Sequence, residues 1–297
     1  MKTLIPIFAL ALLCVSCSSD DNNSNPSDDL YLQIPDAEFE SKLILQGIDT
    51  DGVINQRMLK TDAFSVTNLN LDFSGGAEIQ DLTGIEGFVN LTKLSAFQNE
   101  IASLDLKFNT KLDTIWLSAN VLKSIDLSYN TKLIQVDIQS NLLESIVGLE
   151  NLTQLEDINL SFNYLEAFSL DTPSLRTLFI SDNDLKTFSV DGAVNLKNIF
   201  LKTNLLDEID LSNNLLLETL VLSDNKLENI NLEKNVKLGY MYISSNLLTS
   251  LDVSNLDELV WLSTHSNPSL TCIKIKSGQT IPTFTKSEWQ ELNTVCN

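Results

Sequence analysis

The sequence predicts a solenoid in which one short coil is repeated along the chain and contributes one strand per coil to a parallel sheet. The first observation is an asparagine that recurs at intervals of 20 to 22 residues, as Asn99, Asn120, Asn141, Asn163, Asn183, Asn204, Asn225, Asn246 and Asn267. The second is that apolar residues stand eight, five and three positions before it, as Leu112, Ile115 and Leu117 stand before Asn120. A period held over nine copies is typical of stacked, quasi-one-dimensional folds.

Each position of the repeat has a physical reason. Side chains alternate along a strand, so the residues at −5 and −3 point the same way, and one coil can bury them only against its neighbours. The asparagine amide carries donors and an acceptor, which can satisfy backbone groups that the following turn buries. Further apolar residues at +2, +5 and +7, such as Leu122, Ile125 and Leu127, close the coil on its far side.

The pattern L-x-x-L-x-L-x-x-N-x-L resembles the leucine-rich repeat. Together with Ile34-Pro35-Asp36, Asp81–Glu86 and Ile125–Leu133, it looks like the secreted leucine-rich-repeat proteins of Bacteroidota, whose coils are similar to those of the internalins. The resemblance covers nearly the whole mature chain. It implies an α/β-type solenoid that is mostly β: a right-handed superhelix with a parallel concave sheet over residues 66–267. It also implies surface display and protein binding or adhesion.

The N-terminus resembles a bacterial lipoprotein signal. Lys2 precedes an apolar run from Leu4 to Val15, which is too short to span a membrane comfortably. Ser16 before Cys17 resembles a lipobox, although Cys14 stands where leucine is usual; an ordinary signal peptide cut elsewhere is the alternative. We therefore expect a signal peptide over 1–16 and a lipidated, flexible tether over 17–29. Its Ser-Ser-Asp-Asp tract resembles the signal that sends such lipoproteins to the outer face of the outer membrane.

We expect a helical N-terminal cap over residues 30–65, because the first coil would otherwise expose its apolar edge. Pro35 and Asp36 mark a helix start, with Phe39 and Leu43 on one face. The loop from Asp49 to Gly52 resembles half of a calcium loop. However, Gly47 and Met58 would occupy its first and twelfth positions and offer no side-chain oxygen, so an Asp-Gly turn is favoured.

Residues 268–297 are expected to form a C-terminal cap. Cys272 and Cys296 are the only cysteines left after processing, in an oxidising compartment, so we expect them to form a disulfide. Closing that loop would constrain the unfolded chain by about 3 kcal/mol in the loop-entropy model. A reactive thiol pair is the alternative, but neither a C-x-x-C motif nor a basic neighbourhood supports it.

Composition and motifs argue against several functions. The net charge of −21 and pI near 4.2 disfavour nucleic acid and anionic membranes as partners, leaving membrane contact to the lipid anchor alone. No G-x-S-x-G, H-E-x-x-H or phosphate-binding loop occurs, so we expect no enzyme, metal or cofactor. Asp137 and Asp157 on adjacent coils could form a glycosidase pair, but an open face gives no reason for either pKa to rise. Asp105 and Asp126 are expected to form a solvated acidic edge rather than a cation site.

Strand residues at −6, −4 and −2 face away from the core and line the concave surface. The candidate binding residues are Trp116, Phe179, Phe200, Val221, Tyr240, Tyr242, Trp261 and His265, most of them in the C-terminal half. Exposed contiguous apolar surface often marks an interaction site. The alternative is that aromatic residues are there because they favour strands and stack across them. His265 lacks a nucleophile to activate and is expected to be a contact residue.

Three functions remain open from the sequence. The first is binding of an unknown protein of a host or neighbouring cell through the concave face. The second is carbohydrate binding, in which Gln135, Asp137, Asn159 and Asn198 would supply hydrogen bonds beside the aromatic rings. The third is a passive spacer or coat protein without a specific ligand.

Overall fold

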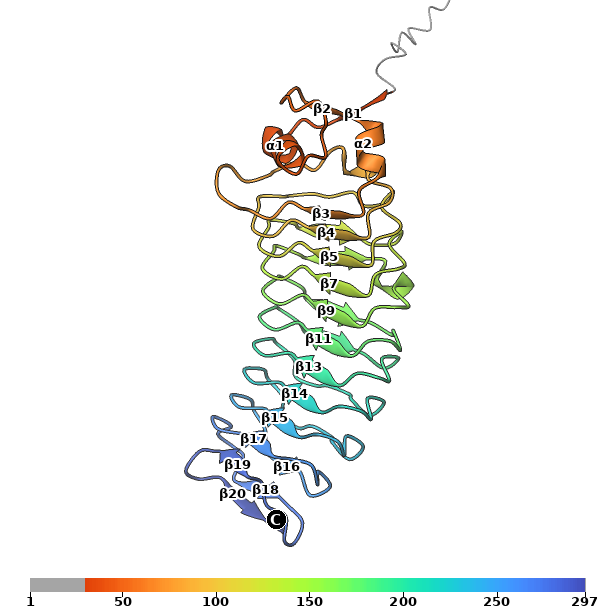
Figure 1. Cartoon of the computed structure of the whole chain (residues 1–297). Helices are drawn as coiled ribbons and strands as arrows, with labels where there is room; N and C mark the ends of the chain where they lie inside the picture. The colour runs from red at the N-terminus through yellow and green to blue at the C-terminus, as the bar shows by residue number, and fades with distance from the viewer. Residues whose placement is uncertain (1–29, 297) are drawn as a thin grey trace, which may run out of the picture.

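The computed structural model describes residues 30–296 and confirms the predicted solenoid. The chain winds from an N-terminal cap through a curved stack of coils to the C-terminal end (Figure 1). The predicted signal peptide, Cys17 and the tether lie outside the described residues.

The concave side carries one parallel sheet of eleven strands, in the order β19-β17-β15-β14-β13-β11-β9-β7-β5-β4-β3. Its strands are three residues long, one to a coil: β3 (Asn68–Asn70), β4 (Lys93–Ser95), β5 (Thr114–Trp116), β7 (Gln135–Asp137), β9 (Asp157–Asn159), β11 (Thr177–Phe179), β13 (Asn198–Phe200), β14 (Thr219–Val221), β15 (Tyr240–Tyr242), β17 (Trp261–Ser263) and β19 (Thr283–Thr285). Equivalent residues of successive coils pair in register, as Ile199 pairs with Leu178 and Leu220. The sheet therefore continues into the segment expected to be the C-terminal cap.

The far side of the coils is closed by shorter, interrupted sheets. Three groups of parallel strands occur there: β6 (Ser124–Asp126) with β8 (Ser145–Val147), β10 (Ala167–Ser169) with β12 (Thr187–Ser189), and β16 (Leu251–Asp252) with β18 (Cys272–Lys274) and β20 (Glu291–Asn293). Two coils also carry a short 3-10 helix: η2 (Ile85–Gly87), and η3 (Leu149–Asn151), which follows β8 in the same coil. Both follow a glycine in the left-handed region, Gly84 and Gly148.

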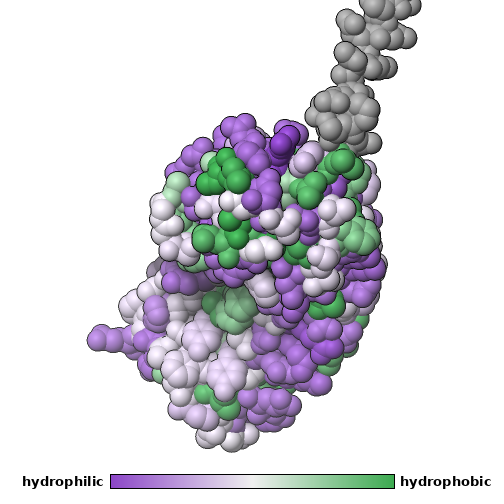
Figure 2. All heavy atoms as spheres, turned by 45° about the horizontal axis from the view of Figure 1, so that its top comes forward, coloured by the Kyte–Doolittle hydropathy of each residue, from purple (hydrophilic) through white to green (hydrophobic). Residues whose placement is uncertain are grey.

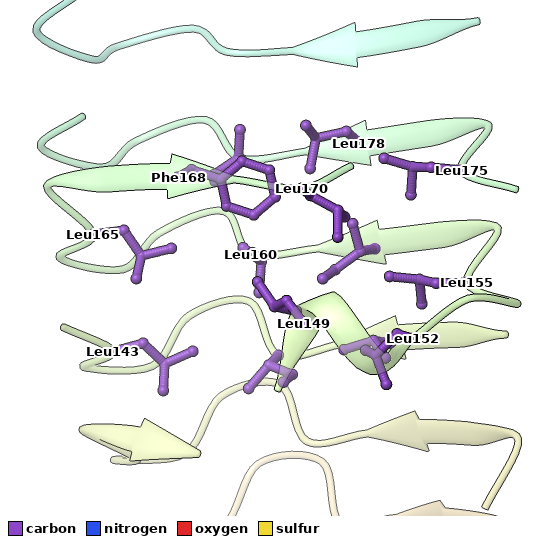
Figure 3. Packing of buried hydrophobic residues seen from close by; sticks show 14 of the residues in the cluster. Leu143, Leu149, Leu152, Leu155, Leu160, Leu165, Phe168, Leu170, Leu175 and Leu178 are labelled. Atoms are coloured by element: carbon purple, nitrogen blue, oxygen red, sulfur yellow. The ribbon is translucent and has the colours of Figure 1, made fainter. Parts of the chain in front are cut away.

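The core is a set of apolar columns running along the solenoid. In Figure 3 the residues at −8, Leu155 and Leu175, lie above one another, and so do the residues at +2, Leu143 and Leu165. Each of these side chains is at most 3% exposed. The repeated leucine spacing thus builds one continuous core, as the sequence predicts, because every coil buries its apolar edge against the next.

The recurring asparagine forms a ladder of hydrogen bonds through the core. Asn204 is representative: its Oδ1 accepts from the backbone N–H of Leu185 in the preceding coil at 3.1 Å. Its Nδ2 donates to the carbonyl oxygens of Ile180 and Leu201 at 3.0 and 3.1 Å. Each amide therefore ties its own turn to the coil before it, which is the role expected from the sequence.

The residue just before each ladder asparagine has a left-handed backbone. All nine have φ between 54° and 60°, namely Gln98, Ala119, Ser140, Phe162, Asp182, Thr203, Asp224, Ser245 and Ser266. This conformation costs a non-glycine residue about 1–2 kcal/mol. It recurs in each coil that has a ladder asparagine because the turn that carries the asparagine inward requires it.

A second, interrupted asparagine ladder lies ten residues further along and was not expected from the sequence. Its members are fully buried: Asn109, Asn130, Asn214 and Asn235. Asn214 Nδ2 donates to the carbonyl oxygens of Val190 and Ala193, both at 3.0 Å. Unlike the first ladder, these four side chains leave Oδ1 buried without a hydrogen-bond partner.

The predicted acidic edge has a structural role in turns. Asp126 and Asp210, both at +6, each accept a backbone N–H two residues on, from Ser128 and Ser212, at 2.8 Å. The hydroxyl and then the N–H of Ser128 lower the pKa of Asp126, and the N–H and then the hydroxyl of Ser212 lower that of Asp210. In the next coil Asn231 makes the same bond to the N–H of Glu233.

These turns predict a pH dependence. A carboxyl whose pKa is lower in the folded than in the unfolded chain stabilises the fold fully above its unfolded pKa of about 4, and this contribution is lost as pH falls through the folded pKa. An asparagine in place of either aspartate keeps the Oδ1 that accepts the backbone N–H but has no proton to gain at low pH. We therefore expect the Asp126→Asn/Asp210→Asn variant to show a shallower fall in thermal midpoint between about pH 5 and 2 than the wild type. Superimposable pH profiles would contradict this role.

The N-terminal cap consists of β1 (Tyr31–Gln33), α1 (Ala37–Leu45), β2 (Arg57–Leu59) and α2 (Lys60–Phe64). The helix start predicted at Pro35-Asp36 is confirmed: Asp36 is the N-cap of α1 and accepts from the N–H groups of Glu38 and Phe39 at 2.9 and 3.0 Å. Phe39 is fully buried. Lys42, which is 6% exposed, donates from Nζ to the carbonyl oxygen of Asp72 at 2.6 Å, and so extends the ladder into the first coil.

The Asp49–Gly52 loop is a hydrogen-bonded turn. Asp49 accepts the N–H of Asp51, and Asp51 accepts the N–H of Val53 and the amide of Asn55. Burial, followed by the charge of Asp51, raises the pKa of Asp49. Over residues 30–296 no group of three or more acidic, histidine or cysteine side chains is arranged to hold a metal ion.

The C-terminal cap contains the disulfide Cys272–Cys296, with the two Cα atoms 5.7 Å apart. Gln290 is fully buried and ends the asparagine ladder. Its Nε2 donates to the carbonyl oxygen of Thr264 at 3.0 Å, which also accepts from Asn267 at 2.9 Å. A single-copy glutamine therefore does in the cap what asparagine does in the repeats.

Candidate functional site

The middle residue of each strand in the concave sheet points into the core and its two neighbours point out. In β13, Ile199 is fully buried whereas Asn198 and Phe200 are half-buried. The register expected from the asparagine period is therefore the one that the structure has. The −2 column is mixed: Ser118, Ser161 and Ser244 are buried, whereas Phe97, Lys202 and His265 are exposed.

Six predicted binding residues are brought together on five adjacent strands, β11 to β17. We call this set the aromatic band; it comprises Phe179, Phe200, Val221, Tyr240, Tyr242 and Trp261. Phe179, Phe200, Val221 and Tyr242 occupy the −4 position, where each pairs with the next across the sheet. Tyr240 is 47% exposed, and the other five are half-buried.

The rings of the band stack along the solenoid. Phe179 and Phe200 have ring centroids 4.5 Å apart and planes inclined by 11°. Tyr242 and Trp261 are 5.9 Å apart with planes inclined by 31°. Because the phenylalanine separation matches the spacing of about 4.8 Å between strands, the two ring faces cover each other and ring edges point to the solvent.

Two predicted binding residues lie apart from the band. Trp116 is on β5, and strands β7 and β9, which carry Asp137 and Asn159 at −4, separate it from Phe179. His265 is exposed just beyond β17, with Nδ1 3.2 Å from Ser266 Oγ. Trp116 is therefore separated from the band by two strands, whereas His265 follows the last strand of the band in the same coil as Trp261.

Ion pairs between neighbouring coils flank the band, just outside the ends of its strands. Arg176 pairs with Glu156 at 3.2 Å, Lys197 with Glu218 at 2.9 Å, and Lys202 with Asp224 at 3.6 Å. Exposed pairs of this kind stabilise a fold little. Their effect here is that the basic side chains around the band are already neutralised by acidic neighbours.

Trp261 carries an unusual polar atom for a surface band. Its Nε1 is buried and has no hydrogen-bond partner. Leaving such a donor unpaired costs about 1–3 kcal/mol. Sequence reasoning could identify Trp261 as a concave residue, but not this orphan donor, which depends on the ring orientation.

The shape of the surface agrees with this description. In Figure 2 the N-terminal cap is turned toward the viewer, and the surface is hollowed below it. Pale and green residues gather in the lower part of that view, with hydrophilic residues around them. Within the described part of the chain, no helix is both long and apolar enough to cross a membrane.

Solved structures with the same fold come from several organisms. The functional domain of InlJ from Listeria monocytogenes, which includes a cysteine ladder, matches with a TM-score of 0.74 at 24% identity over 86% of this chain and 61% of that one. An internalin C2 from the same species matches with a TM-score of 0.55 at 22% identity, over 79% and 94%. The Toll–Spatzle complex of Drosophila matches with 0.58 at 20% identity, over 77% and 32%.

These likenesses show the fold, a leucine-rich-repeat solenoid resembling those of the internalins. This chain spans about three fifths of the InlJ structure. It has only four cysteines, too few for a cysteine in every coil, and the residue that recurs in its coils is asparagine. No protein-family model matches the chain, and no curated protein matches it.

Proposed function

We propose that this chain is a recognition module that binds a protein partner through the aromatic band on the C-terminal half of its concave sheet. The observation that carries the proposal is the band itself: six apolar or aromatic side chains on five adjacent strands, each partly exposed on the concave face. Aromatic anchors of this kind dominate the energetics of protein interfaces. Monomeric proteins rarely expose contiguous apolar surface without such a use.

The ring geometry favours a protein over a carbohydrate partner. A sugar ring packs on the open face of an aromatic side chain, but Phe179 and Phe200 cover each other's faces and present their edges. Between Phe200 and Tyr242, the smaller Val221 leaves a step into which an apolar side chain of a partner can pack. The fold likeness adds support, since the matching Toll structure is of a complex with Spatzle.

The third alternative, a passive spacer, explains why aromatic side chains stack on the sheet but not where on the sheet they lie. Cross-strand aromatic pairs stabilise any sheet. A spacer, however, gains nothing from gathering six such residues on the adjacent strands β11–β17, while β7 and β9, which carry Asp137, Asp157 and Asn159, separate them from Trp116 on β5. A continuous group of this kind is what a binding surface needs.

Binding to extracts of host or neighbouring cells tests the proposal with a matched control. Phe200→Ala/Tyr242→Ala removes two rings from the band, and we expect partner affinity to fall at least about tenfold. Phe162→Ala/Tyr164→Ala removes two rings that are 54% and 53% exposed but lie outside the concave strands, and should bind like the wild type. Circular dichroism verifies that both variants fold. An unchanged set of bound proteins in the band variant would contradict the proposal, and binding on a glycan array would favour the carbohydrate alternative.

Display at the cell surface through lipidated Cys17 is part of the same proposal. It is supported by the Ser16-Cys17 motif and the acidic tract that follows it. Protease treatment of intact cells is expected to release the solenoid. Resistance in intact cells together with cleavage after permeabilisation would place the protein inside the envelope instead.

A further inference from the structure

Two carboxylates lie on the concave face directly beside the N-terminal end of the aromatic band. Asp157 on β9 pairs in register with Thr177 on β11, the strand that carries Phe179. Asp137 lies one strand further on, in β7, where it pairs with Asn159. Both aspartates are half-buried at outward-facing positions.

These two carboxylates have no counter-ion, unlike three of the acids that flank the band. Glu156, Glu218 and Asp224 each pair with a basic side chain. Within residues 30–296, neither Asp137 nor Asp157 forms an ion pair, and Asp137 accepts only from the Ser118 hydroxyl at 2.7 Å and the Gln139 N–H at 3.3 Å. The band therefore adjoins uncompensated negative charge at one end.

The charge of the whole chain acts in the same direction. With 40 acidic and 19 basic residues, the protein attracts basic partners at long range. The basic side chains nearest the band, Arg176, Lys197 and Lys202, are occupied in ion pairs, so they offer little to an acidic partner. Complementary potentials steer association and orient a partner on its surface.

We propose, on the basis of the function proposed above, that the partner presents a protein segment with lysine or arginine beside a cluster of apolar side chains. The apolar cluster packs against Phe200, Val221 and Tyr242, and the basic side chain lies over Asp137 and Asp157. From β9 to β15 there are four strand steps, or about 19 Å at the usual spacing. An extended segment covers that span in about six residues, which sets the separation between its basic residue and its furthest apolar anchor.

Selection from a phage-displayed library of random peptides about 12 residues long tests this chemistry, since that length exceeds the span of the site. Peptides enriched on the wild-type protein are expected to combine aromatic or aliphatic residues with lysine or arginine and to carry net positive charge. The rates of binding of the enriched peptides are then measured on three variants over a range of salt concentrations. The first is Asp137→Asn/Asp157→Asn and the second is Phe200→Ala/Tyr242→Ala. The third, Asp191→Asn/Asp207→Asn, is a control that removes the same charge from exposed positions outside the concave strands.

The two mechanisms separate kinetically. Loss of Asp137 and Asp157 is expected to slow association, reduce its dependence on salt and lower affinity about tenfold, because steering charges act on the on-rate. Loss of Phe200 and Tyr242 is expected to speed dissociation. The charge control should stay within about twofold of the wild type.

Three results would overturn the inference. Enriched peptides that are neutral or acidic but depend on Phe200 and Tyr242 would reject the basic partner while leaving the proposed function intact. If the control variant lost as much affinity, Asp137 and Asp157 would act only through the net charge of the protein and not as a local site. Peptides insensitive to both concave variants, or no enrichment at all, would count against the inference and the proposed function together.

Discussion

Replacing Asn204 with alanine is expected to lower the free energy of unfolding by about 3 kcal/mol, whereas Asn214→Ala in the same coil should cost about 1 kcal/mol. Both side chains are buried asparagines, 5% and 0% exposed, so the transfer and cavity contributions are similar. The difference comes from what each substitution leaves unpaired.

Loss of the Asn204 side chain orphans a buried N–H. The carbonyl oxygens of Ile180 and Leu201 keep a second amide donor, from Asn183 at 3.3 Å and Asn225 at 3.0 Å. The N–H of Leu185 has Asn204 Oδ1 as its partner and would lose it. A buried donor without a partner costs about 1–3 kcal/mol, to which the lost amide bonds add.

Loss of the Asn214 side chain leaves no backbone group without a hydrogen-bond partner. The carbonyl oxygens of Val190 and Ala193 also accept backbone N–H groups, from Ala193 at 3.0 Å and Leu196 at 3.1 Å. The substitution also removes the buried, unpartnered Oδ1 of Asn214. Urea unfolding followed by tryptophan fluorescence compares the two variants. Equal losses would mean that volume rather than hydrogen bonding governs these positions.

The second large effect is expected at Gly148, where alanine should lower the free energy of unfolding by about 3 kcal/mol or more. Gly148 has φ +87°, and a Cβ placed there would lie 2.3 Å from the backbone nitrogen of Ser128 and 2.5 Å from its Cα. These are backbone atoms of the adjacent coil, so the coils themselves must separate.

Gly278 supplies the control. Its φ is +82°, close to that of Gly148, but no heavy atom lies within 4 Å of the position that a Cβ would occupy. Gly278→Ala therefore carries the backbone strain alone, about 1–2 kcal/mol. The two glycine variants are compared by thermal unfolding. If they lost the same stability, close packing between coils would not be the reason for Gly148.

The repeat explains why so much of the fold follows from the sequence. Nine copies of one asparagine fix the register, and the register fixes which side of each strand faces the core, so Phe179, Phe200 and Tyr242 could be placed on the concave side in advance. The disulfide followed from there being two cysteines left to pair. A pattern repeated nine times still indicates the fold where one copy departs from it, whereas a residue that occurs once has no second copy to support its assignment.

Features that occur only once in the chain could not be predicted from the repeat. Lys42 and Gln290 end the ladder at the two caps, but each is a single residue without a repeated neighbour to reveal its partner. The second ladder had a signal, since Asn109 and Asn130 stand ten residues after Asn99 and Asn120. It is interrupted in the next three coils, where the equivalent position is taken by Leu152, Thr172 and Ala193. Ring orientation in the band depends on rotamers chosen by neighbours on the next strand, which no sequence period encodes.

Hydroxyl-radical footprinting of the complex with the captured partner tests the central claim most directly, because it labels aromatic side chains. The proposed docking surface predicts that Tyr240, Tyr242 and Trp261 become protected on binding, while the exposed rings of Tyr164 and Trp289, outside the band, are labelled as in the free protein. Protection of Tyr164 or Trp289 with the band still labelled would place the partner elsewhere and contradict the account.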